Sequence, residues 1–413
     1  MKHIGFIGLG KLGMDCAEVF AEQHTVKGYD IYPRDSTSVK VCSIQEVVNS
    51  SEWIFIAVPT PHAEGYDGSV PSSHMEPKDF EHDAVVDAIN NINKYATGPK
   101  KVVLISTVLP GTTRRKFYSL LDSTHQFLYN PYLIAMGSVK WDMVNPEMIM
   151  IGTEDGNPND LANELVEIYK TIMQNNPRYE IGTWDECESI KIFYNTFISA
   201  KVGIVNMIQD FALRIGHINV DVVTNALARS TMRIMGPKYM TAGMGDAGAC
   251  HPRDNIALRW LAKEYNLGYD LFATVMDARE VQAKNLALFL LDISVMNNNI
   301  PIVIHGKAYK PDVPYCVGSY STLVGHYIEQ EGRKVLYVDP LADNPDNVVD
   351  SVDTAAVFLW AHNRKITYEY TGDQLDTLPY CEIHPGSIIV DPWRKLQSTN
   401  NVEVVHYGNT RNS

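Results

Sequence analysis

Residues 2–13 read Lys2-His-Ile-Gly-Phe-Ile-Gly8-Leu-Gly10-Lys11-Leu12-Gly13, a short apolar stretch that runs directly into three spaced glycines. The apolar stretch predicts a buried strand, and the residues after Gly13 carry apolar side chains at helical spacing. In such a strand–turn–helix unit the glycines allow a tight turn, close approach of a pyrophosphate and close packing of the helix. The pattern therefore predicts a Rossmann-type dinucleotide site, with the phosphates at Gly8, Gly10, Lys11, Leu12 and Gly13.

An acidic residue follows the next predicted strand. Residues 25–29 read Thr-Val-Lys-Gly-Tyr, and Asp30 comes directly after them. A carboxylate at this place accepts hydrogen bonds from the ribose hydroxyls of NAD, whereas a nearby arginine such as Arg34 suits the extra phosphate of NADP. We expect NAD as the cofactor, with Asp30 and Arg34 beside the adenosine ribose.

Two further apolar runs end in turns that carry threonine. Residues 53–58 lead into Pro59 and Thr60, and residues 102–106 lead into Thr107. Ligands of open α/β sheets bind beyond the carboxyl ends of the strands, so these three residues are expected beside the cofactor. Threonine is also an ordinary turn residue, and the strands alone leave both interpretations open.

A second glycine-rich loop lies near the middle of the chain and continues through one cysteine into a predicted helix. It reads Ala242-Gly-Met-Gly245-Asp-Ala-Gly-Ala-Cys250-His-Pro252-Arg-Asp254. Small residues let backbone N–H groups approach a ligand, and proline is favoured in a first helical turn. Because a helix N-terminus stabilises an anion, Cys250 is a candidate nucleophile for a carbonyl carbon. A lone cysteine is also commonly a small buried apolar residue.

A long helix is predicted for residues 185–215, which contain no proline and carry apolar residues at three-to-four spacing. These are Phe193, Phe197, Ala200, Ile204, Ile208 and Phe211. Lys191 and Asn195 stand four residues apart, which brings an ammonium and an amide side by side on another part of the helix surface. Such a pair can donate hydrogen bonds to a developing oxyanion, although it is also typical of a solvated helix face.

Composition excludes several classes of function. The 413 residues carry a formal charge of -14, which argues against nucleic acid or an anionic membrane as a partner. No run of about 18 apolar residues and no secretory leader is recognisable, so we expect neither a membrane span nor secretion. The six cysteines are widely spaced, so we expect no metal site and no disulfide framework, and reduced thiols fit a cytoplasmic protein.

The C-terminal part of the chain repeats the α/β pattern. Apolar runs at 301–305, 334–338, 355–359, 387–390 and 402–405 predict a second parallel sheet. Lys310 follows the first of these runs and suits a phosphate, although lysine on a loop is usually only solvated. We therefore expect an α/β chain with two Rossmann-like doubly wound domains, residues 1–182 and 295–413. A long central helix and a helical region, residues 183–294, would join them.

Six segments, taken in order, point to a family. They are Gly8 to Gly13, Val58-Pro-Thr-Pro61, Ser106-Thr-Val-Leu-Pro-Gly-Thr-Thr113, Glu188-x-x-Lys191-x-x-x-Asn195-x5-Lys201, the loop at Cys250-x-Pro-Arg-Asp254, and Gly306-x-x-Tyr-Lys310-Pro. Together they resemble the nucleotide-sugar 6-dehydrogenases, whose best-known members are UDP-glucose and GDP-mannose dehydrogenases. The resemblance implies NAD on the first domain and a nucleotide sugar on the last, with UDP-glucose as the commonest substrate. It also implies a homodimer formed through the helical region.

The resemblance implies a role for each matching residue. Cys250 would be the nucleophile, Lys191 and Asn195 the oxyanion donors, and Asp254 and Thr107 the groups that hold water or assist proton transfer. The substrate residues would be Lys191, Asn195, Arg233, Gly245 and Lys310. Members of the family oxidise a sugar C6 alcohol to an acid in two hydride transfers, through a thiohemiacetal and a thioester on the cysteine.

The chain departs from the family pattern where two glutamates are usual. Tyr132 and Met136 stand at those positions, so Asp254, with Thr107 and Lys191, is expected to position the hydrolytic water. Tyr132 is better suited to donating a hydrogen bond. Smaller departures place Thr231, Arg253 and Val317 where an acid, a lysine and an arginine are usual. Two alternatives stay open: a two-electron β-hydroxyacid-type dehydrogenase, and a nucleotide-sugar-binding protein with impaired catalysis.

Overall fold

The computed structural model describes residues 1–61, 63, 76, 78–135, 137–215, 217–236, 241–246, 248, 250–364 and 377–408. The chain divides into two compact units, Met1–Gly203 and Ile204–Ser413, here called unit 1 and unit 2. The boundary lies inside the long helix α6 (Trp184–Ile215), which coincides with the helix predicted from the sequence.

Unit 1 is built on one eight-stranded sheet. Its strand order is β3-β2-β1-β4-β5-β6-β7-β8, and neighbouring strands are parallel except for β6 and β7. Strands β2 and β3 lie on one side of β1, and the chain then crosses to β4 on the other side. The strand order therefore reverses between β1 and β4. Ligands of doubly wound sheets bind at this point, beyond the carboxyl ends of the strands. The strands are β1 (His3–Ile7), β2 (Thr25–Tyr29), β3 (Lys40–Val41), β4 (Trp53–Ile56), β5 (Lys101–Leu104), β6 (Gln126–Tyr129), β7 (Met148–Thr153) and β8 (Arg178–Thr183).

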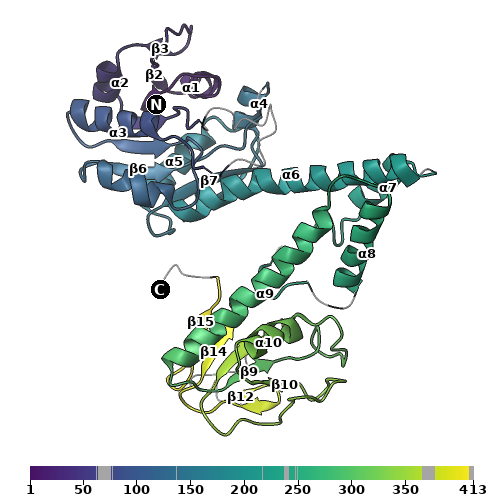
Figure 1. The fold of residues 1–413 in the computed structure, drawn as a ribbon. Helices are drawn as coiled ribbons and strands as arrows, with labels where there is room; N and C mark the ends of the chain where they lie inside the picture. The colour runs from purple at the N-terminus through teal and green to yellow at the C-terminus, as the bar shows by residue number, and fades with distance from the viewer. Residues whose placement is uncertain are drawn as a thin grey trace. The chain divides into compact units, whose positions relative to one another are not determined.

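Helices cover both faces of this sheet (Figure 1). Alternate residues of β4 face opposite ways: Trp53 and Phe55 pack into one apolar core, and Ile54 and Ile56 pack into the other. Every residue of β4 is therefore buried, which explains why the strand reads as a continuous apolar run. The helical elements are α1 (Gly13–Ala21), α2 (Ile44–Ser50), α3 (Asp83–Tyr95), α4 (Val139–Val144), α5 (Asp160–Lys170) and the turns η1 (Thr113–Phe117) and η2 (Tyr118–Leu120).

Unit 2 combines helices with a second parallel sheet. Its five strands run in the order β10-β9-β11-β14-β15. The long helix α9 (Leu271–Met296) packs against this sheet and α10 (Tyr320–Gln330) through a shared apolar core. The remaining elements are α7 (Val220–Ala228), α8 (Cys250–Glu264), β9 (Ile302–His305), β10 (Val335–Val338), β11 (Val357–Trp360), β14 (Ile388–Asp391), β15 (Glu403–His406) and the pair β12 (Thr377–Leu378) and β13 (Cys381–Glu382).

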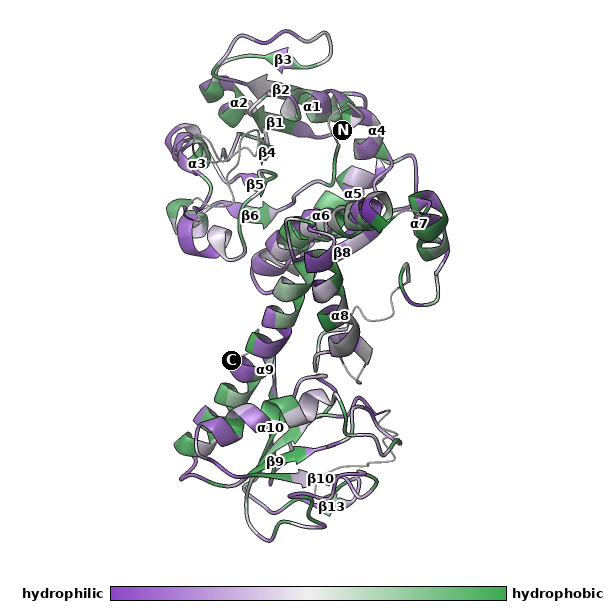
Figure 2. Ribbon diagram, turned by 45° about the vertical axis from the view of Figure 1, so that its right-hand side comes forward, coloured by the Kyte–Doolittle hydropathy of each residue, from purple (hydrophilic) through white to green (hydrophobic). Residues whose placement is uncertain are grey.

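The α/β fold with two parallel-sheet units confirms the predicted fold class. Figure 2 shows both hydrophobic and hydrophilic residues along α9. Part of the apolar face of α6 is nevertheless exposed in the single chain. Phe193 is 56% exposed, Phe197 54% and Ile204 47%.

Candidate functional site

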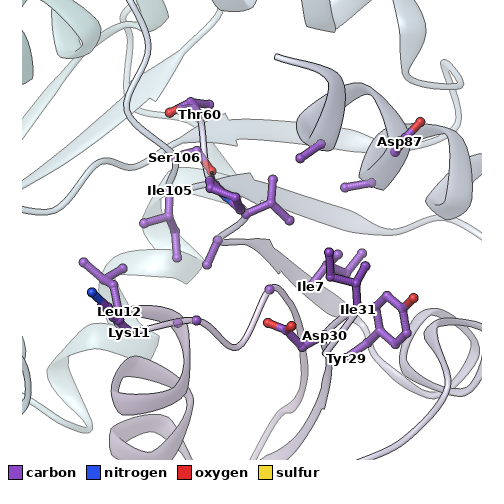
Figure 3. Close-up of a pocket in the computed structure, with 18 of the residues that line it drawn as sticks. Ile7, Lys11, Leu12, Tyr29, Asp30, Ile31, Thr60, Asp87, Ile105 and Ser106 are labelled. Carbon is purple, nitrogen blue, oxygen red and sulfur yellow. Dashed lines mark hydrogen bonds between the residues drawn. The ribbon is translucent and has the colours of Figure 1, made fainter. Parts of the chain in front are cut away.

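A cavity of about 890 Å³ opens in unit 1 at the carboxyl ends of β1, β2, β4 and β5 (Figure 3). It lies at the point where the strand order reverses, which is where the sequence places a dinucleotide. Many of the predicted site residues line it together: Gly8, Gly10, Lys11, Leu12, Gly13, Asp30, Arg34, Pro59, Thr60, Thr107 and Lys191. We call it the unit 1 cavity.

The three glycines of the first turn have different surroundings. Gly8 has a positive φ of 98°, and a Cβ there would lie 2.6 Å from the carbonyl oxygen of Ala57. A Cβ on Gly13 would lie 2.2 Å from the carbonyl oxygen of Gly8, whereas one on Gly10 would meet nothing within 4 Å. Gly8 and Gly13 are therefore required for the tight turn and for the packing of α1, whereas Gly10 leaves open space for a ligand.

Asp30 joins the ends of the first two strands. Its Oδ2 accepts a hydrogen bond from the Leu9 N–H at 2.7 Å, and its Oδ1 accepts one from the Tyr32 N–H at 2.9 Å. The Arg34 guanidinium lies 3.6 Å from Oδ1. A carboxylate has about four acceptor sites, so Asp30 can hold the turn and still accept bonds from a ribose.

Two hydroxyl groups link the turns after β4 and β5. Thr60 Oγ1 donates to the carbonyl oxygen of Thr107 at 2.6 Å, and Ser106 Oγ donates to that of Val58 at 2.6 Å. Both hydroxyl oxygens retain acceptor sites. The sequence left open whether Thr60 and Thr107 are turn residues or ligand residues. In the structure they link the two turns and also line the cavity.

Lys191 brings a cation to the unit 1 cavity. Its ammonium donates to the carbonyl oxygen of Tyr132 at 2.7 Å, and burial lowers the pKa of Lys191 below its usual value. An ammonium has three donors, so two remain after this bond. Lys191 can therefore donate to a developing oxyanion in the cavity.

Tyr132 lines the same cavity, and its side chain packs against the apolar core. The hydroxyl is 2.8 Å from that of Tyr169, which in turn bonds Oδ1 of Asn130. Burial raises the pKa of Tyr132 well above its usual value. A protonated Tyr132 agrees with the view that this residue donates a hydrogen bond, and its hydroxyl group is engaged with that of Tyr169 in the core.

Glu188 lies one turn before Lys191 on α6 and is fully buried. Its carboxylate accepts hydrogen bonds from the backbone N–H groups of Gly111 at 2.5 Å and Thr113 at 2.8 Å. Burial raises the pKa of Glu188. The glutamate thus ties α6 to the segment after β5 that contains Thr107, a contact for which the sequence motif suggested no role.

Asn195 lies one turn after Lys191 on α6, is exposed and does not line the unit 1 cavity. Arg233 is exposed in the turn after α7. The Lys310 ammonium lies 5.3 Å from the centroid of the Tyr309 ring. Arg233, Gly245 and Lys310 all belong to unit 2, as does Cys250.

Cys250 is the first residue of α8, and Pro252 lies in the first turn of that helix as predicted. The cysteine backbone is therefore at a helix N-terminus, where a thiolate is stabilised. The side chains of Cys250, Arg253 and Asp254 lie outside the described residues, and so does Met136.

Several cavity residues were not recognised in the sequence. On α3, Ala84, Asp87, Ala88 and Asn91 recur at three-to-four spacing and line the unit 1 cavity opposite the turn. Tyr29, Ile31 and Tyr32 line it around the end of β2. The stripe of small and polar residues on α3 is the sequence feature that could have indicated them, because a core-facing helix would carry larger apolar residues there.

Two features are absent from the residues that the structure describes. No group of three or more histidine, cysteine, aspartate or glutamate residues is arranged there to hold a metal ion. Within the same residues, no helix is both long and apolar enough to cross a membrane.

Comparison with known proteins gives one family. Residues 33–173 match the NAD binding domain of the UDP-glucose/GDP-mannose dehydrogenase family, and residues 185–280 match its central domain. A UDP-glucose 6-dehydrogenase of Gallus gallus is 24% identical over 75% of this chain and 62% of its own length. The UDP-glucose 6-dehydrogenase TuaD of Bacillus subtilis is 24% identical over 72% of this chain and 61% of its own length. The chain thus spans about three fifths of the length of these curated relatives.

A solved structure shares the fold. A GDP-mannose dehydrogenase from Pseudomonas aeruginosa, in a ternary complex, superposes with a TM-score of 0.78 at 17% identity. The superposition covers 97% of this chain and 99% of that one. At this identity the likeness establishes the architecture and leaves the substrate open.

Proposed function

The chain belongs to the UDP-glucose/GDP-mannose dehydrogenase family, and we propose that it oxidises the C6 hydroxyl of a nucleotide sugar to a carboxylate. One observation carries the proposal. The unit 1 cavity, which has the features of a dinucleotide site, is also lined by Lys191, whose ammonium bonds the Tyr132 carbonyl oxygen and retains two donors. A cation beside the cofactor is what alcohol oxidation requires, because negative charge develops on the substrate oxygen.

The residues of the unit 1 cavity fit NAD. The space beside Gly10 is open, α1 presents its N-terminus to the pyrophosphate, and Asp30 retains acceptors for the ribose hydroxyls. Thr107 and Lys191 would lie at the reacting end. When bound, NAD accepts the hydride that the sugar carbon loses.

The residues of this chain carry the rest of the reaction. Lys191, with Asn195, stabilises the oxyanion, and the Cys250 thiolate adds to the aldehyde carbon to give a thiohemiacetal. Loss of a second hydride leaves a thioester, and water releases the acid and regenerates the thiol. Asp254 and Thr107 position that water. The balance is one alcohol, two NAD and one water giving one carboxylate, two NADH and three protons.

UDP-glucose is the proposed substrate, since the relatives from Gallus gallus and Bacillus subtilis described above are named for it. Arg233, Gly245 and Lys310 would bind the substrate, with Lys310 at the diphosphate.

We assign residues 1–182 to NAD, 183–294 to the catalytic cysteine and to dimerisation, and 295–413 to the nucleotide sugar. The exposed Phe193 and Phe197 on α6 support a homodimer. The five described cysteines are free, which supports a cytoplasmic location.

The alternative is a two-electron dehydrogenase that stops at the aldehyde. It is favoured by the position of the Tyr132 hydroxyl, which leaves this residue without a part in hydrolysis. The third possibility, binding without catalysis, predicts no NADH from any sugar.

The first experiment measures NADH release with UDP-glucose, GDP-mannose and N-acetylated UDP-sugars, for the wild-type protein and Cys250→Ser. We expect turnover on UDP-glucose and none to the acid in Cys250→Ser, because a serine hydroxyl ionises far less readily than a thiol. Near-wild-type acid formation by Cys250→Ser would refute the proposed nucleophile.

A further inference from the structure

The glycine-rich loop before α8 is fastened to the rest of unit 2 by its backbone. The carbonyl oxygen of Ala242 accepts a hydrogen bond from the Arg394 guanidinium at 2.6 Å. A Cβ on Gly243 or on Gly245 would lie 2.1 Å from a ring carbon of Trp393 or of Tyr320, respectively. Both glycines are thus required for packing against aromatic rings, a role that the sequence did not suggest.

An ion pair fixes the next residue of the loop. The Nε of Arg279, on α9, donates to Oδ1 of Asp246 at 2.5 Å, and the Arg279 side chain is only 10% exposed. The guanidinium carbon of Arg279 lies 5.5 Å from the centroid of the Tyr320 ring, whose hydroxyl donates to the Arg279 carbonyl oxygen at 3.3 Å. One buried cation therefore links the loop to α9 and α10.

We propose that Asp246 and Arg279 are positioning residues that hold the loop, and with it the backbone of Cys250 at the start of α8, in the arrangement needed for reaction. Asp246 is four residues before Cys250, so release of its carboxylate would remove one of the bonds that hold the segment entering the helix, another being that from the Gly248 N–H to the Gly318 carbonyl oxygen. A charge-assisted hydrogen bond to a nearly buried guanidinium restricts such motion far more than an exposed ion pair does. The inference rests on the proposed function only for the role of Cys250.

A second ion pair of unit 2 provides the matched control. Arg259 on α8 bonds Asp270 at 3.0 Å, with side chains 45% and 34% exposed, and neither residue belongs to the glycine-rich loop. Asp270 also accepts a bond from the Ala273 N–H as the N-cap of α9. Asparagine is an equally good N-cap, so Asp270→Asn removes the ion pair and leaves the helix intact.

The test compares Asp246→Asn and Asp270→Asn in the full chain by hydrogen–deuterium exchange and by steady-state kinetics. In Asp246→Asn we expect the amides of residues 241–250 to exchange at least about tenfold faster, which is the effect of losing one charge-assisted bond. We expect kcat to fall by a similar factor, with KM for NAD unchanged because the NAD site lies in unit 1. Arg279→Lys should retain more activity than Arg279→Gln. Asp270→Asn should change neither the exchange nor kcat.

Unchanged exchange in Asp246→Asn would overturn the inference. Faster exchange with full kcat would also overturn it, because the loop would then be held without benefit to the reaction. Failure of the proposed function has a separate signature. If Cys250→Ser kept its turnover to the acid, the cysteine mechanism would be refuted. The amide exchange rates of Asp246→Asn would still decide whether the ion pair fixes the loop.

Discussion

Two glycines of the first turn, Gly10 and Gly13, should respond differently to substitution by alanine. Gly10→Ala places a methyl group in the open space beside the turn, and we expect the Kd for NAD to rise at least about tenfold with stability changed by less than about 0.5 kcal/mol. Gly13→Ala places its methyl group 2.2 Å from the Gly8 carbonyl oxygen. The clash outweighs the higher helix propensity of alanine, so unfolding should become about 1–2 kcal/mol easier. Calorimetric titration and urea unfolding measure the two effects. Equal effects of the two substitutions on NAD affinity would contradict the assignment.

Asp30 should select NAD over NADP. Its carboxylate is held toward the turn by the Leu9 N–H and would repel a ribose phosphate. Juxtaposed like charges cost several kcal/mol, so kcat/KM for NAD should exceed that for NADP at least about a hundredfold. Asp30→Ala should reduce the ratio. Comparable values for the two cofactors in the wild-type protein would mean that Arg34 dominates this end of the cavity.

Some side-chain roles follow from local sequence and others do not. The glycine turn and Asp30 could be predicted because their functions depend on residues close together in the chain. The Tyr132 hydroxyl and the Glu188 carboxylate could not, because their partners are Tyr169 and Gly111, which tertiary packing alone brings near. The side chains of Cys250 and Asp254 stay predictions.

Glu188 links α6 to the segment after β5 through hydrogen bonds from Gly111 and Thr113, and this contact should affect the pH dependence of stability. Burial raises the pKa of Glu188 in the folded state, so the folded protein binds more protons than the unfolded chain between the ordinary and the raised pKa. Protonation of Glu188 therefore stabilises the fold, and this contribution is lost as the pH rises through the raised pKa. Relative to Glu188→Gln, the wild-type protein should gain stability as the pH is lowered through the raised pKa toward the ordinary pKa of glutamate, measured by urea unfolding. If the difference in the free energy of unfolding between the two proteins were constant, or larger at the higher pH, a raised pKa of the buried Glu188 would be contradicted.

Secondary-structure elements were easier to predict than the surfaces they present. Strands β1, β2, β4 and β5 of the first sheet and all five strands of the second are found within about two residues of their predicted positions, because strands buried on both faces read as continuous apolar runs. Strands β3, β6, β7 and β8 were not predicted. The contribution of α3 to the unit 1 cavity was missed. Its Asp87 and Asn91 lie far in sequence from the glycine turn, and only the sheet order brings them opposite it.

Assembly of the whole molecule should depend on the exposed apolar face of α6. Phe193 and Phe197 are more than half exposed, at 56% and 54%, which is costly for two large aromatic side chains. If they form the proposed dimer interface, Phe197→Glu should shift the protein toward the monomer in sedimentation velocity experiments, because a buried unpaired charge is expensive. Lys170→Glu, an exposed charge change on α5, should not. A wild-type protein that sediments as a monomer at all concentrations would exclude the interface.

The central claim is a four-electron oxidation in which the unit 1 cavity supplies NAD and Lys191, and Cys250 holds the sugar carbon between the two steps. Its most direct test is the ratio of NADH formed to sugar consumed, measured with limiting UDP-glucose and with the product identified by mass spectrometry. The account predicts two NADH for each UDP-sugar acid. One NADH with the aldehyde released into solution would contradict it and would make the protein a two-electron dehydrogenase.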